Sequence, residues 1–499
     1  MSSTLPAVPA LDGTWETAPE VVGRFSRDFG NLITWRPQAV LRPGSVQDIV
    51  TMIDYARCHG LTIAMNGQSG TDQDLESHSN YGQAAVPGGI AIDSRGLSTI
   101  HSIGATSADV DSGVTWGALF DAALAQGKTP PVLLDGFPHL SIGGTVSVGG
   151  IGGSTQQFGL LCDTVEEIEV VTGEGQLLTA SATTRPELFN AVLAGGGQCG
   201  IIVRAKVKLI PAPARALVIS LFYDDLPTYL ADQEKILSEG RFSHQEGEIV
   251  RRTDDTVVRY NMEALADRDR ALRDERFSRL VRTPDASAWR YRIEAVTYYS
   301  PPTVPDQAAL LAGLRDDRPS AQITEQSYRD WAFRLDPFIE FLKNGGYWEQ
   351  PHPWLSLVLP ASTTLDVIRS VVAELTPGDL GVGFTGLYPF TTSKLTRPLF
   401  ALPSPPEPVA YLFDLIRFPV PGDPGIPGML DQNRRYYDRA VAAGGKRYII
   451  GAIPGMTQEE WRRHFDHQFD RFAHAKKRCD PDNVLTPGQG FFCKEGSHE

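Results

Sequence analysis

Residues 141–154 constrain the fold more than any other segment. They read Ser-Ile-Gly-Gly-Thr-Val-Ser-Val-Gly-Gly-Ile-Gly-Gly-Ser, so six of the fourteen residues are glycine. Glycine lets the backbone come close to a ligand, and successive backbone N–H groups can surround a pyrophosphate. The same composition is also typical of a turn between strands. The pattern alone therefore leaves two interpretations open, a phosphate-binding wrap and a plain glycine-rich turn.

A second glycine cluster, residues 195–200, matches the GxGxxG pattern of dinucleotide-binding proteins. That fingerprint requires a preceding strand and a following helix. Residues 201–210 instead alternate between apolar and basic side chains, which predicts a strand with one solvated face. The context therefore disfavours a Rossmann NAD site. The sequence also contains no GxxxxGK[ST] phosphate loop and no GxSxG motif.

The size and charge of the chain exclude several classes of protein. With 499 residues it exceeds the ~250–300 residues at which one hydrophobic core stops growing, so we expect two lobes. The formal net charge of −14 disfavours a non-specific nucleic-acid or anionic-membrane binder. No run reaches the ~18 apolar residues of a membrane span, and the N-terminus lacks the pattern of a secretory signal.

The cysteines are few and scattered, at positions 58, 162, 199, 479 and 493, and none forms a CxxC pair. This distribution supports neither a disulfide framework nor a zinc cage, and we expect a reduced, cytoplasmic setting. His464, His467 and His474 lie near one another in the sequence but have no HExxH context, so we interpret them as polar faces of a helix. We therefore expect no metal site.

Periodicity gives a coarse order of elements. A β-α-β start is predicted from a helix over residues 45–59, with Ser45 as N-cap and Asp48 completing a capping box, followed by a strand over 61–65. Further strands are expected at 90–93 and 165–172, and the prolines at 211 and 213 suggest a domain boundary. Beyond that boundary the predicted helices are 228–239, 267–282 and 430–444, the predicted strand is 291–299, and a further helix follows residue 457.

Short motifs spread along the chain resemble one protein family in both identity and order. They occupy residues 28–30, 37–43, 78–84, 143–151, 170–175, 187–189, 197–202, 246–247, 298–299, 352–355, 431–435, 480–481 and 485–489. Together they resemble the FAD-linked oxidases of the vanillyl-alcohol oxidase superfamily, with their PCMH-type FAD-binding domain, and among these most closely the cytokinin dehydrogenases. Each motif alone is weak, but this many in order is specific for the fold.

The resemblance implies an α+β fold with two lobes, a PCMH-type FAD-binding domain and a substrate domain whose antiparallel sheet is covered by helices. The expected divisions are an N-terminal lead-in over residues 1–36, the FAD-binding domain over 37–213, the substrate (cap) domain over 214–456, and a C-terminal segment over 457–499 that returns to the FAD domain.

The resemblance also implies roles for individual residues. His78 corresponds to the histidine that carries FAD covalently. Asp135 is the carboxylate nearest the position of the family's proton acceptor, and Trp354 corresponds to a wall of the substrate pocket. The remaining positions that match FAD contacts are Ser79, Gln83, Ser141, Gly144, Thr145, Ser147, Ile151, Ile202, Tyr448, Thr486 and Gln489.

Three departures from the family pattern leave alternatives open. About nine or ten extra residues precede His78, so a rival register would put Gln68 where the histidine belongs, with FAD bound non-covalently. Asp135 lies one residue farther from Gly143 than the family's acid does, so the nearby His139 could share the role of base. The residues around Tyr448 also differ from the family pattern, which puts a cytokinin substrate in question.

The implied activity is an FAD-dependent oxidation. Hydride would leave a carbon next to nitrogen in a small molecule, an imine would form and hydrolyse, and electrons would pass to O₂ or another acceptor. The alternatives on the same fold are an alcohol or sugar oxidase, or a tailoring oxidase of a natural-product pathway. A second alternative is a flavin-binding protein without catalytic turnover.

Overall fold

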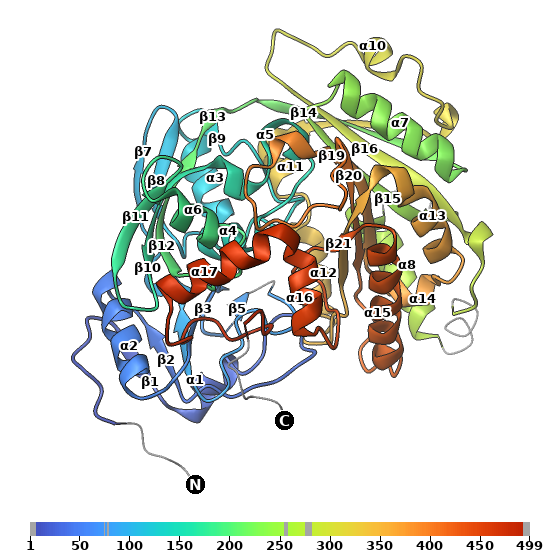
Figure 1. Cartoon of the computed structure of the whole chain (residues 1–499). Coiled ribbons are helices and arrows are strands. Elements are labelled where there is room, and N and C mark those ends of the chain that lie inside the picture. The colour runs from blue at the N-terminus through green and yellow to red at the C-terminus, as the bar shows by residue number, and fades with distance from the viewer. Residues whose placement is uncertain (1–5, 74, 77–78, 254–257, 275–281, 493–499) are drawn as a thin grey trace.

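The computed structural model describes residues 6–73, 75–76, 79–253, 258–274 and 282–492; His78 lies outside these ranges. The chain forms two lobes that lie side by side (Figure 1), and the mixture of helices, one partly parallel sheet and antiparallel sheets confirms the expected α+β fold. Within the described ranges, none of the helices combines the length and the apolar character needed to cross a membrane.

The first lobe begins with a four-stranded sheet in the order β1-β2-β6-β3. Its strands are Thr14–Glu16 (β1), Ala39–Arg42 (β2), Ile63–Asn66 (β3) and Ile90–Asp93 (β6). Strands β2 and β3 run parallel to β6, whereas β1 is antiparallel to β2. Part of the segment expected as a loose lead-in is thus an edge strand of this sheet, and helix α1 (Pro19–Arg24) follows it.

Helix α2 (Val46–Cys58) covers this sheet and confirms the predicted β-α-β start. Its apolar residues recur at three- and four-residue spacing, which places Ile49, Met52 and Ile53 in the core. The predicted capping box is wrong, because the Ser45 side chain makes no capping hydrogen bond. Asp48 instead accepts hydrogen bonds from the backbone N–H groups of Asp12, Gly13 and Gly44, and so fixes the N-terminal segment.

A five-stranded antiparallel sheet completes the first lobe, in the order β11-β10-β12-β8-β7. Its strands are Ile100–Ile103 (β7), Ser107–Asp111 (β8), Val165–Val171 (β10), Leu177–Ser181 (β11) and Ile201–Lys208 (β12). Strand β12 alternates between buried and solvated side chains, as its sequence predicts. Helices α3 (Trp116–Leu124), α4 (Ile142–Val148) and α6 (Pro186–Val192) contribute to the same apolar core.

The second lobe contains two antiparallel sheets, in the orders β15-β16-β14-β17 and β19-β20-β18-β21. The first is built from Arg215–Tyr223 (β14), His244–Arg251 (β15), Trp289–Tyr299 (β16) and Gln322–Ser327 (β17). The second is built from Leu355–Pro360 (β18), Phe384–Thr391 (β19), Val409–Ile416 (β20) and Lys446–Arg447 (β21). The edge strands β15 and β19 meet where the Thr385 hydroxyl bonds to both the N–H and the C=O of Ile249.

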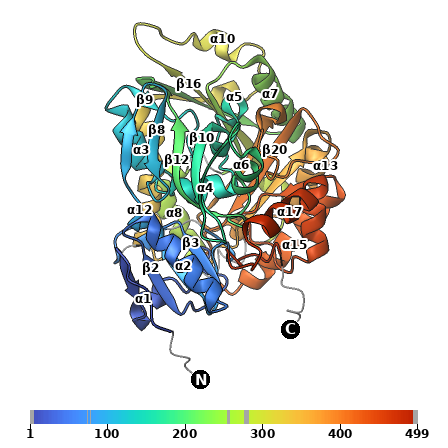
Figure 2. The ribbon, with the colours of Figure 1, turned by 60° about the vertical axis from the view of Figure 1, so that its left-hand side comes forward.

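Three long helices cover the outer face of these sheets: α7 (Leu226–Glu239), α13 (Ala361–Val372) and α15 (Ile426–Ala442). Helix α8 (Met262–Arg273) starts and ends earlier than the predicted range 267–282, whose last residues fall partly outside the described ranges. Figure 2 shows the sheet and helices of this lobe beside the first-lobe strands. The inner face of the two sheets remains available to form a wall between the lobes.

The C-terminal segment returns to the first lobe, as Figure 1 shows for α16 (Gln458–Phe465) and α17 (Phe469–Cys479). Leu485 pairs with Ile63 at the edge of β3. Lys476 donates to the Asp480 carboxylate at 2.6 Å, and that carboxylate accepts from the N–H groups of Val484 and Leu485. This buried pair fixes the turn that carries Thr486 and Gln489 to the interior.

Candidate active site

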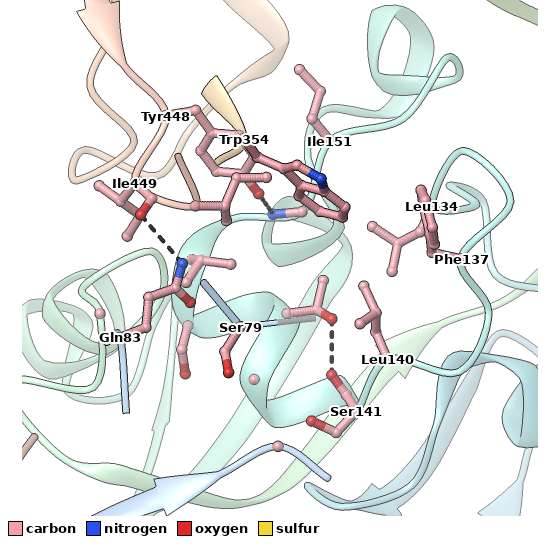
Figure 3. A pocket seen from close by; sticks show the side chains of 18 of the residues that line it. Ser79, Gln83, Leu134, Phe137, Leu140, Ser141, Ile151, Trp354, Tyr448 and Ile449 are labelled. Carbon is pink, nitrogen blue, oxygen red and sulfur yellow. Dashed lines mark hydrogen bonds between the residues drawn. The ribbon is translucent and has the colours of Figure 1, made fainter. Parts of the chain in front are cut away.

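A cavity between the two lobes collects nearly all of the residues that the family resemblance implicates (Figure 3). Residues from many separate stretches of both lobes line it. Those expected from the sequence are Ser79, Gln83, Asp135, Ser141, Gly144, Thr145, Ser147, Ile151, Ile202, Trp354, Tyr448, Thr486 and Gln489. In Figure 3 the apolar side chains of Leu134, Phe137 and Leu140 gather on one side, and Ser79 and Gln83 lie on the other.

The glycine-rich segment forms a helix followed by a tight turn, and so is not the plain turn between strands that was one of the two interpretations. Residues 142–148 are helix α4, which ends at Gly149 with a φ of 116°. Gly143 and Gly144 lie in the first turn, where Gly144 faces Gly67 across the cavity edge. An added Cβ at Gly67 would lie 2.4 Å from Ser141 Oγ, so a larger residue there would displace the Ser141 hydroxyl. This wall therefore presents backbone to whatever occupies the cavity.

The second glycine cluster continues the same wall. Gly196 and Gly197 have φ values of 61° and 73°, a backbone conformation that favours glycine. Gln198 Nε2 donates to the Thr486 carbonyl at 2.8 Å and so joins this turn to the C-terminal segment. The strand β12 follows directly, which confirms that the GxGxxG match is not a Rossmann fingerprint.

These residues fit an FAD group on two structural grounds. The Gly67, Gly144, Gly196 and Gly197 backbone leaves a cradle that side chains would fill. Gln489 lines the cavity with its Nε2 donating to the Ile449 carbonyl at 3.0 Å, while its buried Oε1 has no partner. A buried acceptor of this kind needs a donor, and a flavin ring carries one.

Asp135 lies where the two lobes meet. Its Oδ1 accepts from Gly153 N–H at 2.8 Å, and its Oδ2 accepts from the Tyr388 hydroxyl at 2.5 Å. Burial raises the pKa of Asp135 well above its usual range, and the negative charge of Glu246 raises it further. The two hydrogen bonds and the Arg334 guanidinium partly oppose this rise. A carboxyl group with such a pKa is suited to exchange protons with a substrate.

A buried charge network supports Asp135 from the second lobe. Glu246 on β15 accepts from Arg334 Nη2 at 2.5 Å and pairs with His244 Nε2 at 2.6 Å. Burial disfavours its charge, but Arg334 and His244 outweigh that effect and lower the pKa of Glu246. Asp135, His244 and Glu246 could together ligate a cation, since their ligand atoms lie within 4.8 Å of one another. Their hydrogen bonds to Arg334, Tyr388 and Gly153 instead make them a hydrogen-bonded network.

Sequence reasoning missed most of this network as functional. Glu246 entered only as part of a family motif, and Tyr388 and Arg334 gave no signal because their partners lie far away in the sequence. Another carboxylate, Asp414, also lines the cavity. One signal was available for it: Asp414 interrupts the apolar strand Tyr-Leu-Phe-Asp-Leu-Ile of β20.

Trp354 and Tyr448 both line the cavity, and each is held in position by contacts with neighbouring residues. Trp354 packs against Phe29 and Phe418, with ring centroids 5.2 and 5.7 Å away, and donates its Nε1–H to the Arg417 carbonyl. The Tyr448 hydroxyl accepts from Gly150 N–H at 3.1 Å, which joins the second lobe to the glycine-rich turn. Both are thus fixed wall residues.

The two residues that the sequence left as alternatives, His139 as the base and Gln68 at the flavin-linking position, both lie outside the cavity lining. His139 does not line the cavity; its Nε2 lies 3.3 Å from Asp336 Oδ1 in a partly exposed position. Gln68 is buried, with its N–H donating to Ser94 Oγ, and does not line the cavity either. The neighbouring Gly67 and Ser79 do line it.

Two family models match the chain. Residues 213–492 match the model described as "Cytokinin dehydrogenase 1, FAD and cytokinin binding", and residues 37–181 match the "FAD binding domain" model. These two ranges correspond broadly to the second lobe with the C-terminal segment and to the first lobe.

Similar proteins cover nearly the whole chain. An uncharacterized oxidoreductase from the fasciation locus of Rhodococcoides fascians is 33% identical over 96% of this chain and 99% of its own. Cytokinin dehydrogenase 1 of Oryza sativa subsp. japonica is 32% identical (97% of this chain, 92% of its own), and cytokinin dehydrogenase 2 of Arabidopsis thaliana is 30% identical (97% and 94%). The matches, together with a cavity built on glycine backbone, show that the chain is an FAD-dependent oxidoreductase of the cytokinin dehydrogenase family.

Proposed function

We propose that the protein removes hydride from a carbon next to nitrogen in a small amine, giving an imine that water hydrolyses. The observation that carries this proposal is the buried Asp135, held at the cavity by Tyr388 and Gly153. The names of the relatives, cytokinin dehydrogenases, support oxidation of an N-substituted amine. Electrons would leave to O₂ or another acceptor.

FAD supplies the hydride acceptor when it is bound. The first-lobe wall would hold it: Gly144 and Gly197 through backbone, Ser79 and Gln83 through polar side chains, and Gln489 through its unpartnered Oε1. Ile151 and Ile202 would pack against its apolar surface and exclude water.

Asp135 would accept the proton of the substrate nitrogen. Its two hydrogen bonds orient both carboxylate oxygens, so the nitrogen would approach from the open side of the cavity. Because the pKa of Asp135 is raised, its ionised carboxylate is a stronger base than an ordinary aspartate and is suited to take that proton. Trp354 would limit the space beside it and position the carbon to be oxidised.

Covalent attachment of FAD through His78 is part of the same proposal. Ser79 beside His78 and Gly67 beside Gln68 both line the cavity, but Gln68 itself is buried outside the lining, which supports the His78 register. The test is a visible spectrum before and after acid precipitation. We expect a yellow pellet that turns colourless in His78→Ala; yellow colour left in the supernatant of the wild-type protein would contradict the covalent link.

The reaction class is tested by anaerobic mixing of FAD-loaded protein with N6-isopentenyladenine and with other secondary amines. We expect bleaching of the flavin absorbance and the release of an aldehyde together with the shortened amine. Bleaching only by alcohols or sugars, with a carbonyl as the sole product, would favour the alternative oxidase. Absence of bleaching by any of these compounds would support a flavin-binding protein without turnover on them and contradict the proposal.

A further inference from the structure

Asp414 is the one carboxylate on an otherwise apolar strand face. Strand β20 directs alternate side chains, Leu412, Asp414 and Ile416, toward the cavity. The intervening Phe413 and Leu415 pack into the core under the outer helices. A strand buried on both faces is normally apolar throughout, so a carboxylate at this position is a departure that packing does not require.

The strands on both sides leave room around this carboxylate. Its neighbours in register are Gly386 on β19 and Ser356 on β18, two of the smallest residues. A Cβ at Gly386 would lie 3.3 Å from Asp414 Cβ and 3.4 Å from its Oδ2. Glycine therefore keeps that oxygen open toward the cavity.

Asp414 has no counter-charge among the described residues. Its Oδ1 is buried without a hydrogen-bond partner, and none of the ion pairs of the described chain includes it. The other acidic residues of this wall differ, because Glu246 pairs with Arg334, and Glu248 pairs with Arg259 and Arg292. A buried charge without a partner is costly to the fold, which points to a ligand as the missing partner.

The charges along the cavity define what that ligand can be. The charged residues that line it are Asp135, Glu246, Glu248 and Asp414, all acidic, and no lysine or arginine of the described residues stands among them. Because arginines behind the wall compensate Glu246 and Glu248, the uncompensated charge is that of Asp414. An anionic group would be repelled from it, whereas a protonated or N–H-bearing nitrogen would be attracted.

We propose that Asp414 binds a nitrogen of the substrate and selects amines over alcohols of the same shape. This assignment rests on the proposed function, because it specifies the substrate class of the same cavity. Asp414 acts as a specificity residue through a charge-assisted hydrogen bond, while Asp135 remains the proton acceptor.

The test uses a matched pair of ligands that cannot be oxidised. In 2-phenylpropan-2-amine and 2-phenylpropan-2-ol the carbon beside the heteroatom carries no hydrogen, so binding to FAD-loaded protein is measured by calorimetry without turnover. At pH 8 we expect the amine to bind at least about tenfold more tightly than the alcohol. Asp414→Asn should reduce this ratio to about one, and Asp366→Asn, which removes an exposed carboxylate on α13, should leave it unchanged.

The pH dependence separates Asp414 from its neighbours. Burial raises the pKa of Asp414 to about 7, with the Ser356 hydroxyl opposing this in part, so the preference for the amine should weaken between pH 8 and pH 6. The titratable groups that face Asp414 are Tyr388 on β19, Tyr448 after β21, and Asp135. The pKa values of both phenols are raised, so Tyr388 and Tyr448 stay neutral between pH 6 and pH 8. Any pH dependence of the amine preference that comes from Asp135 would remain in Asp414→Asn.

Each outcome decides the assignment. A wild-type protein that does not prefer the amine, or an Asp414→Asn variant that keeps the preference, overturns it. Asp414→Ala provides a second variant should the asparagine form fail to fold. Failure of the proposed function gives a different result: the ligand preference and its loss in Asp414→Asn would persist, but oxidisable amines would not bleach the flavin.

Discussion

The first-lobe wall of the cavity presents backbone, whereas the second-lobe wall presents charged side chains. The first is assembled from glycines of two contiguous segments, at Gly143–Gly150 and Gly195–Gly200. The second is assembled from β15, β19 and β20, and each strand contributes one or two polar groups. The difference indicates that one wall is suited to a large, flat cofactor of fixed shape, and the other to a small ligand recognised by charge.

The largest effect is expected at the point where the walls meet. Asp135→Asn keeps the shape of the side chain but removes the base, so the rate of flavin reduction should fall about 10²- to 10⁴-fold. Flavin content should stay at the wild-type level, because Asp135 is not one of the glycines that form the cofactor side of the cavity. Stopped-flow absorbance measures both. A rate within threefold of wild type would mean that another group takes the proton.

A substitution in the glycine wall of the first lobe should lower the affinity for FAD instead of the rate of the proton transfer. Gly144→Leu would fill the gap toward Gly67, and we expect FAD affinity to fall about tenfold or more, since overpacking costs ~1–3 kcal/mol. Gly23→Leu on α1 is the control, because an added Cβ there meets nothing within 4 Å. Reconstitution of flavin-free protein measures the affinity. Equal affinities in both variants would show that glycine at 144 serves the fold alone.

The charged wall should control pH dependence. Asp135 must be deprotonated to act as base, and its raised pKa means that activity rises with pH. Glu246→Gln removes the neighbouring negative charge, so the pKa of Asp135 falls and the rising limb of kcat/KM should move to lower pH by about one unit. Asp366→Asn should leave the limb in place. A limb that stays fixed in Glu246→Gln would assign it to another group.

The smallest effect is on stability. The folded protein holds the pKa of Asp414 at about 7, above its ordinary value of 3.8, so the folded state favours the protonated form. The resulting cost is absent below about pH 4, grows as pH rises toward 7, and is at most about 4 kcal/mol above that. Asp414→Asn should therefore raise Tm by about 1–4 °C at pH 8 and by less at pH 5. A lower Tm at pH 8 would show that Asp414 has a structural partner.

Local sequence was sufficient for much of the fold. The period of the apolar residues predicted α2 and β12 within one or two residues, because helices and strands bury faces at fixed spacings. Local sequence was not sufficient to predict the role of Asp48, whose carboxylate accepts hydrogen bonds from the N–H groups of Asp12 and Gly13. A capping box competes with any other donors that tertiary structure brings near.

The motifs of the sequence by themselves indicated the family and the residues that line the cofactor side of the cavity, and they left Asp135 and His139 as the candidate bases. Only the tertiary structure decided that Tyr388 and Glu246 surround Asp135, that His139 lies outside the cavity, and that Asp414 stands there without a counter-charge among the described residues. The physical reason is tertiary placement: β15 belongs to a different sheet from β19 and β20, and only the meeting of the two sheets brings Glu246, Tyr388 and Asp414 to one cavity.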